Sequence, residues 1–198
     1  MLNLTHWDAH RLASPELKRA FAGTVNRHRE AWATCTLYLG IEDVFGDDVA
    51  PYHQLVVDEP LRGIGAHSTF ATLGAGPQGF RAVTMSTHAR SDVNVDKHVV
   101  SQTLIDALTA LFPAARDAKK PVVMPGTPTT WQNFTGRSGG RVGGLPFDFA
   151  TLRRGFPTGR TGVKGLVRVG DTVFPGQSVP ACAWGARRVV RELIDSAP

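Results

Sequence analysis

Apolar residues repeat at helical spacing in three segments of the chain. The first is residues 14–29, where Ser14 is placed to cap the helix and an acidic residue follows in the first turn. The second is residues 99–111, and Pro113 ends it because proline cannot continue a helix. The third is residues 179–194 near the end of the chain. Its small residues are suited to close packing: Ala181, Cys182, Ala183 and Ala186.

Other segments are rich in β-branched and apolar residues and are bounded by Gly, Pro and Asp, a pattern typical of strands. The expected strands are residues 33–41, 53–58, 68–73, 80–89, a short strand within 119–131 that leaves into a loop, and 163–171. Residues 136–146 form a glycine-rich connection with few side chains to pack. The order of these elements predicts an α+β protein with a mixed sheet and packed helices.

Gly74, Gly76 and Gly79 have the G-x-G-x-x-G spacing with which dinucleotide-binding proteins hold a pyrophosphate. That use requires a helix that begins at the second or third glycine, whereas the residues after Gly79 are strand-like. The Gly-Pro-Gln-Gly sequence instead has the residues expected of a turn. We therefore predict a hairpin turn that joins residues 68–73 to residues 81–87.

Charge is distributed unevenly along the chain. The 198 residues carry a net charge of +5, and ten basic residues between Arg137 and Arg191 face only Asp148 and Asp171 in the same stretch. This half of the chain should attract anions, either as a solvated basic face or at a specific site. No nucleic-acid-binding motif is present, so we do not expect nucleic acid as a partner.

The hydrophobic content of 42% is typical of a protein with a buried core. No window approaches the roughly 18 apolar residues of a membrane span, and the start of the chain lacks the order of a signal peptide. These features predict a cytoplasmic location.

Cysteine and histidine positions give no metal site. Cys35 and Cys182 lie far apart in the sequence without metal-ligand spacing, so we expect buried free thiols rather than a disulfide. His6 and His10 could share one helical face, but no third ligand lies nearby, and ordinary polar roles near a terminus are favoured.

Two further segments resemble catalytic motifs but lack residues that those motifs require. Ser178 lies in a sequence that resembles a nucleophile elbow, yet Pro180 replaces the second glycine and no histidine follows to complete a triad. The glycine-rich residues 136–146 lack the Gly-Lys-Ser/Thr ending of a phosphate loop. Serine hydrolysis and P-loop nucleotide hydrolysis are therefore not expected.

Residues 165–189 carry the strongest signal for function. A strand is expected to deliver Gly170 and Asp171 to a Pro/Gly turn, after which a helix starts near Val179 with free N–H groups that favour a negative charge. Gly170 permits close approach to the backbone, and the carboxylate of Asp171 can accept hydrogen bonds from sugar-like hydroxyls. The alternative is a plain strand-turn-helix in which the aspartate caps the turn.

The sequence GLVRVGDTVFPGQSVPA, residues 165–181, resembles the C-terminal flavin-binding signature of the phytoene desaturase and carotenoid isomerase family of FAD-dependent oxidoreductases, which are related to amine oxidases. The resemblance extends more loosely through residues 126–146, 79–90, 36–40 and 3–8. It therefore covers nearly the whole chain, and its C-terminal motif is the most specific part.

This resemblance implies a flavoprotein whose C-terminal strand and helix lie under FAD. Asp171 would bind the ribityl or phosphate part, and the backbone around Gln177 to Val179 would face the isoalloxazine ring. The cofactor-binding residues expected on this basis are Gly170, Asp171, Gly176, Gln177, Ser178 and Val179. The resemblance assigns no catalytic acid or base.

The resemblance also implies a division of the chain. Residues 1–30 would be a connecting segment and helix, residues 31–135 a substrate-covering domain that shelters a long polyene, and residues 136–198 the C-terminal part that completes an FAD-binding α/β domain. His88 is a polar candidate in a strand expected to line the substrate pocket, and the alternative is a hydrogen-bonded structural histidine.

Family members open with a G-x-G-x-x-G unit for the ADP part of FAD, and residues 74–79 cannot replace it because they fall inside the substrate-domain match. The chain thus resembles the C-terminal portion of a longer enzyme.

The expected function is FAD-dependent desaturation or isomerisation of a carotenoid or other isoprenoid polyene, by this chain or by an enzyme of which it is a part. The alternative is a non-catalytic remnant or the partner-binding half of a split flavoenzyme. Expected partners are the polyene, an N-terminal FAD-binding half or a second copy, and a membrane surface, which a polyene would favour.

Overall fold

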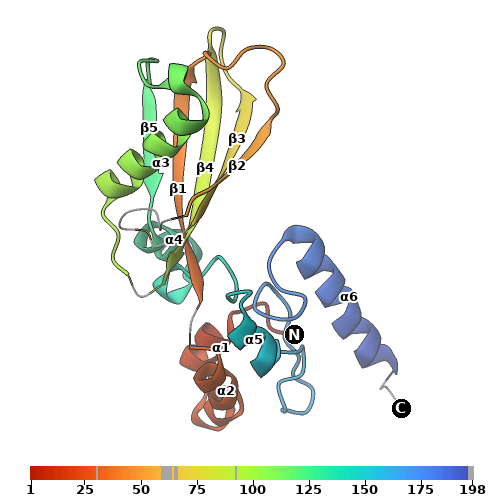
Figure 1. Cartoon of the computed structure of the whole chain (residues 1–198). Helices are drawn as coiled ribbons and strands as arrows, with labels where there is room; N and C mark the ends of the chain where they lie inside the picture. Colours follow the sequence, from red (N-terminus) through yellow and green to blue (C-terminus); the bar gives the residue numbers. More distant parts are fainter. Residues whose placement is uncertain (30, 59–63, 65–66, 92, 196–198) are drawn as a thin grey trace. The chain divides into compact units, whose positions relative to one another are not determined.

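The computed structural model describes residues 1–29, 31–58, 64, 67–91 and 93–195. These residues form two compact units (Figure 1). Unit 1 combines the two ends of the chain, Met1–Trp32 and Arg141–Pro198, and unit 2 is the middle, Ala33–Gly140. The N-terminal helices and the C-terminal segment therefore fold together.

Unit 2 is built on a five-stranded sheet with the order β2-β3-β4-β1-β5. Its strands are β1 (Trp32–Glu42), β2 (Tyr52–Val56), β3 (Ser68–Ala75), β4 (Phe80–Arg90) and β5 (Val122–Gly126). The pairs β1/β5, β2/β3 and β3/β4 are antiparallel. The α+β class and these strand positions are confirmed, but the expectation of a mixed sheet is wrong, since short connections such as the β3–β4 turn join neighbouring strands in opposite directions.

The glycine motif of residues 74–79 is the turn between β3 and β4. Ala75 pairs with Arg81, and the amide of Phe80 donates to the carbonyl of Pro77 at 2.8 Å. Gly79 has φ +80°, and a Cβ on Gly76 would lie 2.6 Å from the carbonyl oxygen of Phe80. The motif is glycine-rich because the turn requires it, which confirms the hairpin prediction.

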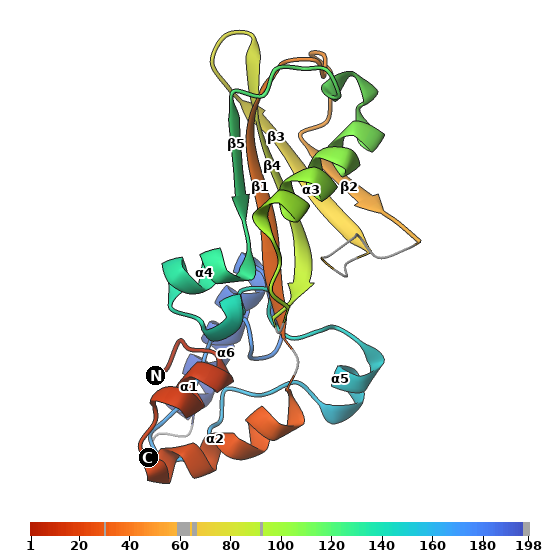
Figure 2. The ribbon, with the colours of Figure 1, turned by 90° about the vertical axis from the view of Figure 1, so that its left-hand side faces the viewer.

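Helix α3 (Lys97–Leu111) covers one face of the sheet, as Figure 2 shows. It begins two residues before the predicted start because the side chain of Asp96 caps it by accepting a hydrogen bond from the amide of His98 at 2.7 Å. Alternate residues of β1 pack against buried side chains of the helix. The buried residues of these two elements in this core are Cys35, Leu37, Leu39, Ile41, Val100, Leu104, Ala107 and Leu108. Each buried leucine contributes about 1.5–3 kcal/mol.

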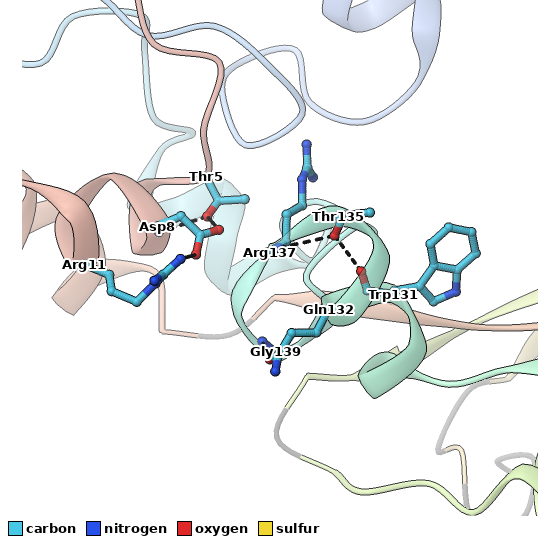
Figure 3. A network of polar contacts seen from close by, with 8 residues as sticks. All are labelled: Thr5, Asp8, Arg11, Trp131, Gln132, Thr135, Arg137 and Gly139. Atoms are coloured by element: carbon cyan, nitrogen blue, oxygen red, sulfur yellow. Dashed lines mark hydrogen bonds and ion pairs between the residues drawn. The ribbon is translucent and has the colours of Figure 1, made fainter.

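The segment after β5 is a helix where the sequence predicted a loop. Helix α4 spans Pro128–Thr135, and Thr127 and Thr130 form a capping box at its start. Figure 3 shows the same segment closing on itself: the side chain of Gln132 accepts from the amide of Gly139 at 2.6 Å. The short one-turn helices η1 (Pro113–Ala115) and η2 (Ser138–Gly140) complete unit 2.

Unit 1 contains the helices α1 (His6–Leu12), α2 (Pro15–Arg27), α5 (Phe149–Arg154) and α6 (Val179–Asp195). Helices α2 and α6 are confirmed, and Ser14 occupies the N-cap position of α2, although its side chain makes no capping hydrogen bond. Helix α1 was not predicted. Its N-cap Thr5 accepts from the amide of Asp8 at 3.1 Å and donates to the Asp8 carboxylate at 2.6 Å (Figure 3).

The predicted strand at residues 163–171 is wrong. The segment makes two isolated bridges, Leu2 with Arg168 in parallel and Arg160 with Val167 antiparallel. Gly165 and Gly170 have φ +75° and +117°, so the backbone turns away at both ends before a ladder can extend. The segment is therefore held by single residue pairs on each side.

Among the described residues, no helix is long and apolar enough to cross a membrane.

Candidate functional site

The loop of residues 170–178 in unit 1 connects the bridged segment to α6. Two turns shape it: the amide of Val173 donates to the carbonyl of Gly170 at 3.1 Å, and the amide of Gly176 donates to the carbonyl of Val173 at 2.8 Å. Gly170 and Gly176 have φ +117° and +108°, which L side chains rarely adopt. Both predicted glycines are thus required by the path of this loop, and Gly176 is buried in it.

Ser178 caps helix α6. Its hydroxyl accepts from the amide of Ala181 at 3.2 Å, and its carbonyl accepts from the amide of Cys182 at 2.9 Å. Because Pro180 has no N–H, the first turn leaves the amide of Val179 without a protein partner among the described residues. The helix start therefore offers one amide to a ligand, rather than the several that the sequence suggested.

The backbone of Ser178 is in an unusual conformation. Its φ is +111°, and it is the one residue other than glycine with positive φ in the described part of the chain. Such a conformation costs on the order of 1–3 kcal/mol and is found preferentially at functional sites. Ser178 adopts this conformation at the junction between the loop and the first residue of α6.

The glycine-rich segment before α5 lies against this loop. A Cβ on Gly144 would lie 3.2 Å from Cβ of Gln177 and 3.3 Å from the carbonyl oxygen of Asp171. Gly144 has φ +73° and its carbonyl accepts from the amide of Trp32 at 3.0 Å. The fold therefore brings two distant segments together at Asp171 and Gln177.

The predicted cofactor residues differ in exposure. Gly170 and Asp171 are half-buried, whereas Gln177, Ser178 and Val179 are exposed, and Val179 is 85% exposed. The exposed helix start, with its single available amide, can interact with an electron-rich group of a ligand.

A buried cluster beside α1 was missed by sequence reasoning. The indole N–H of Trp7 and Nε2 of His6 both donate to the carbonyl of His28, at 3.1 and 3.3 Å. Burial lowers the pKa of His6 from 6.5 to about 3, and the nearby positive charges of Arg168 and Arg141 act in the same direction. His6 is therefore neutral and structural, and no group of metal-ligating residues forms around it among the described residues.

A hollow in unit 1 lies elsewhere. It has a volume of about 490 Å³ and is formed by residues 159–167 with Val189, Glu192 and Leu193 of α6. None of the predicted cofactor residues lines it.

Unit 2 presents a second face of the sheet, which we call the open face. Its residues alternate with the core residues along each strand: Thr34, Thr36, Tyr38, Tyr52, Gln54, Val56, Phe70, Thr72, Ala82, Thr84, Ser86, His88, Val122 and Met124. The residues of β4 on this face are mostly small. Larger exposed side chains flank them, with Phe70 and Tyr52 stacked on one side and Tyr38 and Met124 on the other.

His88 lies on the open face of β4, where it is half-buried. The sequence predicted a strand at His88, and that strand is confirmed; the role of His88 in a substrate pocket stays a prediction. The predicted hairpin already placed Phe70 beside this strand. The sequence could not identify Tyr38 and Met124 as neighbours, because they reach it through the sheet order β4-β1-β5, which joins segments distant in the chain.

No family model matches the chain. Across 96% of its length the chain is 26% identical to the chloroplastic prolycopene isomerase of Daucus carota, and the match covers 35% of that protein. Two chloroplastic prolycopene isomerases of an Oncidium hybrid cultivar are 36% identical over 104 residues, which is 49% of this chain and 17% of theirs. The chloroplastic prolycopene isomerase of Arabidopsis thaliana is 38% identical over 72 residues, which is 34% of this chain and 12% of that protein.

The chain spans about a third of the length of the carrot relative and less of the others. Its distant homologues are carotenoid isomerases.

Proposed function

We propose that this chain is part of an FAD-dependent oxidoreductase that desaturates or isomerises a carotenoid or another isoprenoid polyene. The observation that carries the proposal is the similarity to prolycopene isomerases along nearly the whole chain. In the proposed division of labour, unit 1 holds the flavin and unit 2 contacts the polyene. The flavin, when bound, would accept or donate the electrons of the reaction.

The loop of unit 1 supports the flavin-binding part of the proposal. Gly170 and Gly176 allow the backbone to turn within a short distance. In the proposed site the carboxylate of the half-buried Asp171 would accept hydrogen bonds from ribityl hydroxyls. The amide of Val179 at the start of α6 would stabilise negative charge on the isoalloxazine ring. Gln177 and Ser178 would contact the ring through their backbone.

The open face supports the substrate part. A polyene is long, apolar and flat, so it gains affinity by covering exposed apolar and aromatic side chains. The small side chains Ala82, Thr84 and Ser86 of β4 leave room for such a chain between the larger residues on either side. His88 at the end of this strip is a candidate to position the substrate or to move a proton.

The test of flavin binding uses the chain as it is. The protein is mixed with FAD, passed through a desalting column and examined for the visible absorbance of flavin. We expect retention, with Asp171→Ala weakening it roughly tenfold, as expected when a hydrogen bond to a charged acceptor is lost. Asp195→Asn, an exposed acid at the end of α6, is the matched control and should retain flavin normally.

Two results would count against the proposal. Equal retention by Asp171→Ala and the unchanged protein would remove Asp171 from the site. No retention of flavin by any variant, including in the presence of a polypeptide that carries a G-x-G-x-x-G unit, would remove the flavin-binding role of this chain.

A second function is favoured by a different observation. Several large apolar side chains of unit 1 are highly exposed: Phe147, Phe149, Trp184, Val179 and Ile194. Apolar patches of this kind mark interaction surfaces. The chain would then act as the partner-binding half of a split flavoenzyme. Sedimentation equilibrium at high concentration tests this alternative, because an exposed apolar interface should cause self-association when its partner is absent. A chain that remains monomeric and soluble would count against it.

A further inference from the structure

Arg168 is a buried arginine in unit 1 whose guanidinium has few contacts. Its side chain is 2% exposed, and Nη2 donates to the carbonyl of Thr158 at 3.5 Å, the long limit for a hydrogen bond. The guanidinium also lies 6.0 Å from the centre of the Phe21 ring. Nε and Nη1 have no hydrogen-bond partner among the described residues.

An arginine in this situation is expensive to bury. A charged group removed from water loses several kcal/mol of hydration, and it is normally paired with a carboxylate or a phosphate. Burial lowers the pKa of Arg168, and among the described residues no carboxylate acts on that pKa in the opposite direction. Arginine nevertheless remains charged in proteins, so the cost is not removed by loss of a proton.

The surroundings increase the positive potential at this point. Burial and nearby cations including Arg168 lower the pKa values of His6 and His28, so neither side chain offers Arg168 a negative charge. Arg141 is a second cation close enough to act on His6. Four residues after Arg168, the hydroxyl of Thr172 is also buried without a partner. The segment that leads into the loop of residues 170–178 thus contains several unsatisfied polar groups and an uncompensated charge.

We infer that Arg168 binds an oxyanion, the phosphate group of a small molecule, inside unit 1. The phosphate oxygens would accept hydrogen bonds from Nε and Nη1, and the negative charge would offset the buried positive charge. Free phosphate and the phosphates of a nucleotide share this chemistry. This inference does not depend on the proposed function, because it rests on Arg168 alone.

The surrounding backbone can give access to the site. Two isolated residue pairs hold the backbone here: Arg168 pairs with Leu2, and the preceding Val167 pairs with Arg160. Isolated pairs of this kind open more readily than a continuous sheet. We expect the anion to enter by local opening of this segment.

The experiment compares thermal unfolding of the full chain in sodium phosphate and in sodium chloride of the same ionic strength. The unchanged protein should gain stability with phosphate in a saturable way, with a rise in Tm of about 5–10 °C at a hundred times the Kd. Arg168→Met should show no rise beyond that in chloride. Without phosphate it should melt at a higher temperature than the unchanged protein, because a buried unpaired charge has been removed.

Two further variants make the result specific. Arg187→Met removes an exposed arginine from α6 of the same unit and should keep the full phosphate effect. Arg168→Lys keeps the charge and should keep a smaller phosphate effect, which preserves the test if the methionine variant does not fold. A phosphate effect that persists in Arg168→Met, or that is equal to the chloride effect in the unchanged protein, would overturn the inference.

Competition between FAD and free phosphate identifies the compound that supplies the phosphate group. If FAD removes the response to free phosphate and riboflavin does not, the phosphate belongs to the flavin nucleotide. If the effects of FAD and phosphate add, a separate phosphate compound binds at Arg168. A phosphate response without any flavin binding would support Arg168 as a phosphate site and count against the proposed function alone.

Discussion

Gly144 lies against Asp171, so that a Cβ on Gly144 would be 3.3 Å from the carbonyl oxygen of Asp171. The two residues are 27 positions apart in the sequence, and each belongs to a glycine-rich loop. Their contact fixes the position of the residue predicted to bind the cofactor. The glycine-rich segment therefore shapes the candidate site without contributing a functional side chain.

We expect Gly144→Ala to displace the loop that contains Asp171 and Gln177. Gly144 and Gly162 both have positive φ, so alanine at either position costs about 1 kcal/mol of backbone strain. Only Gly144 has atoms close to the added Cβ, whereas Gly162 has nothing within 4 Å. Chemical denaturation should show a larger loss of stability for Gly144→Ala, and FAD retention should fall for this variant alone. Equal losses in the two variants would mean that the contact has no role.

Gly185 of α6 provides a second matched pair. A Cβ on Gly185 would lie 3.1 Å from the carbonyl oxygen of Phe174 and 3.2 Å from Cδ of Pro175, whereas Gly23 of α2 has nothing within 4 Å. Because alanine is favoured over glycine in helices by about 1 kcal/mol, Gly23→Ala should raise the free energy of unfolding. Gly185→Ala should give no gain or a loss. A gain at both positions would show that the loop adjusts freely to α6.

Stability should decrease in acid because of His6. Its pKa is lowered from 6.5 in the unfolded chain to about 3 in the folded protein, so the unfolded state binds the proton more readily. The stability contributed by neutral His6 is complete above pH 6.5 and is lost progressively as the pH falls toward 3. The expected slope approaches about 1.4 kcal/mol per pH unit in this window.

The measurement is urea unfolding at several pH values between 3 and 7. His6→Asn can still donate to the carbonyl of His28 and should flatten the acid dependence, although His28, whose pKa is also lowered by burial, will retain part of it. His10→Asn, which changes a half-buried residue of the same helix, is the control. The same acid slope in His6→Asn as in the unchanged protein would contradict the assignment.

The strand predictions succeeded where each strand is paired along its length. Residues 33–41 and 80–89 alternate because one face of the sheet packs on α3, and that alternation is visible in the sequence. Residues 163–171 have a similar composition, but each of the two segments that pair with them supplies one residue, Leu2 or Arg160, and two glycines turn the chain away. Composition could not distinguish the paired strands from this segment, because the difference lies in how many residues of a neighbouring segment are available to pair.

The binding roles of the candidate site residues stay predictions. The glycines and Asp171 of the loop were chosen from a local pattern, and the structure adds the contact of Asp171 and Gln177 with Gly144. Arg168 was not chosen, because a single arginine between valines carries no signal of burial. Its lack of a partner emerges only once the surrounding residues are in place.

The sequence by itself determined the local elements of this protein: the hairpin at Gly76 and Gly79, the amphipathic helices, and the loop that ends at the cap of α6. Each depends on residues close together in the chain, whose conformational preferences act locally. Only the tertiary structure decided that both chain ends form one unit, that Gly144 meets Asp171, and that Arg168 is buried with Nε and Nη1 unpaired among the described residues. These relationships join distant segments, and they arise from packing, which no local pattern records.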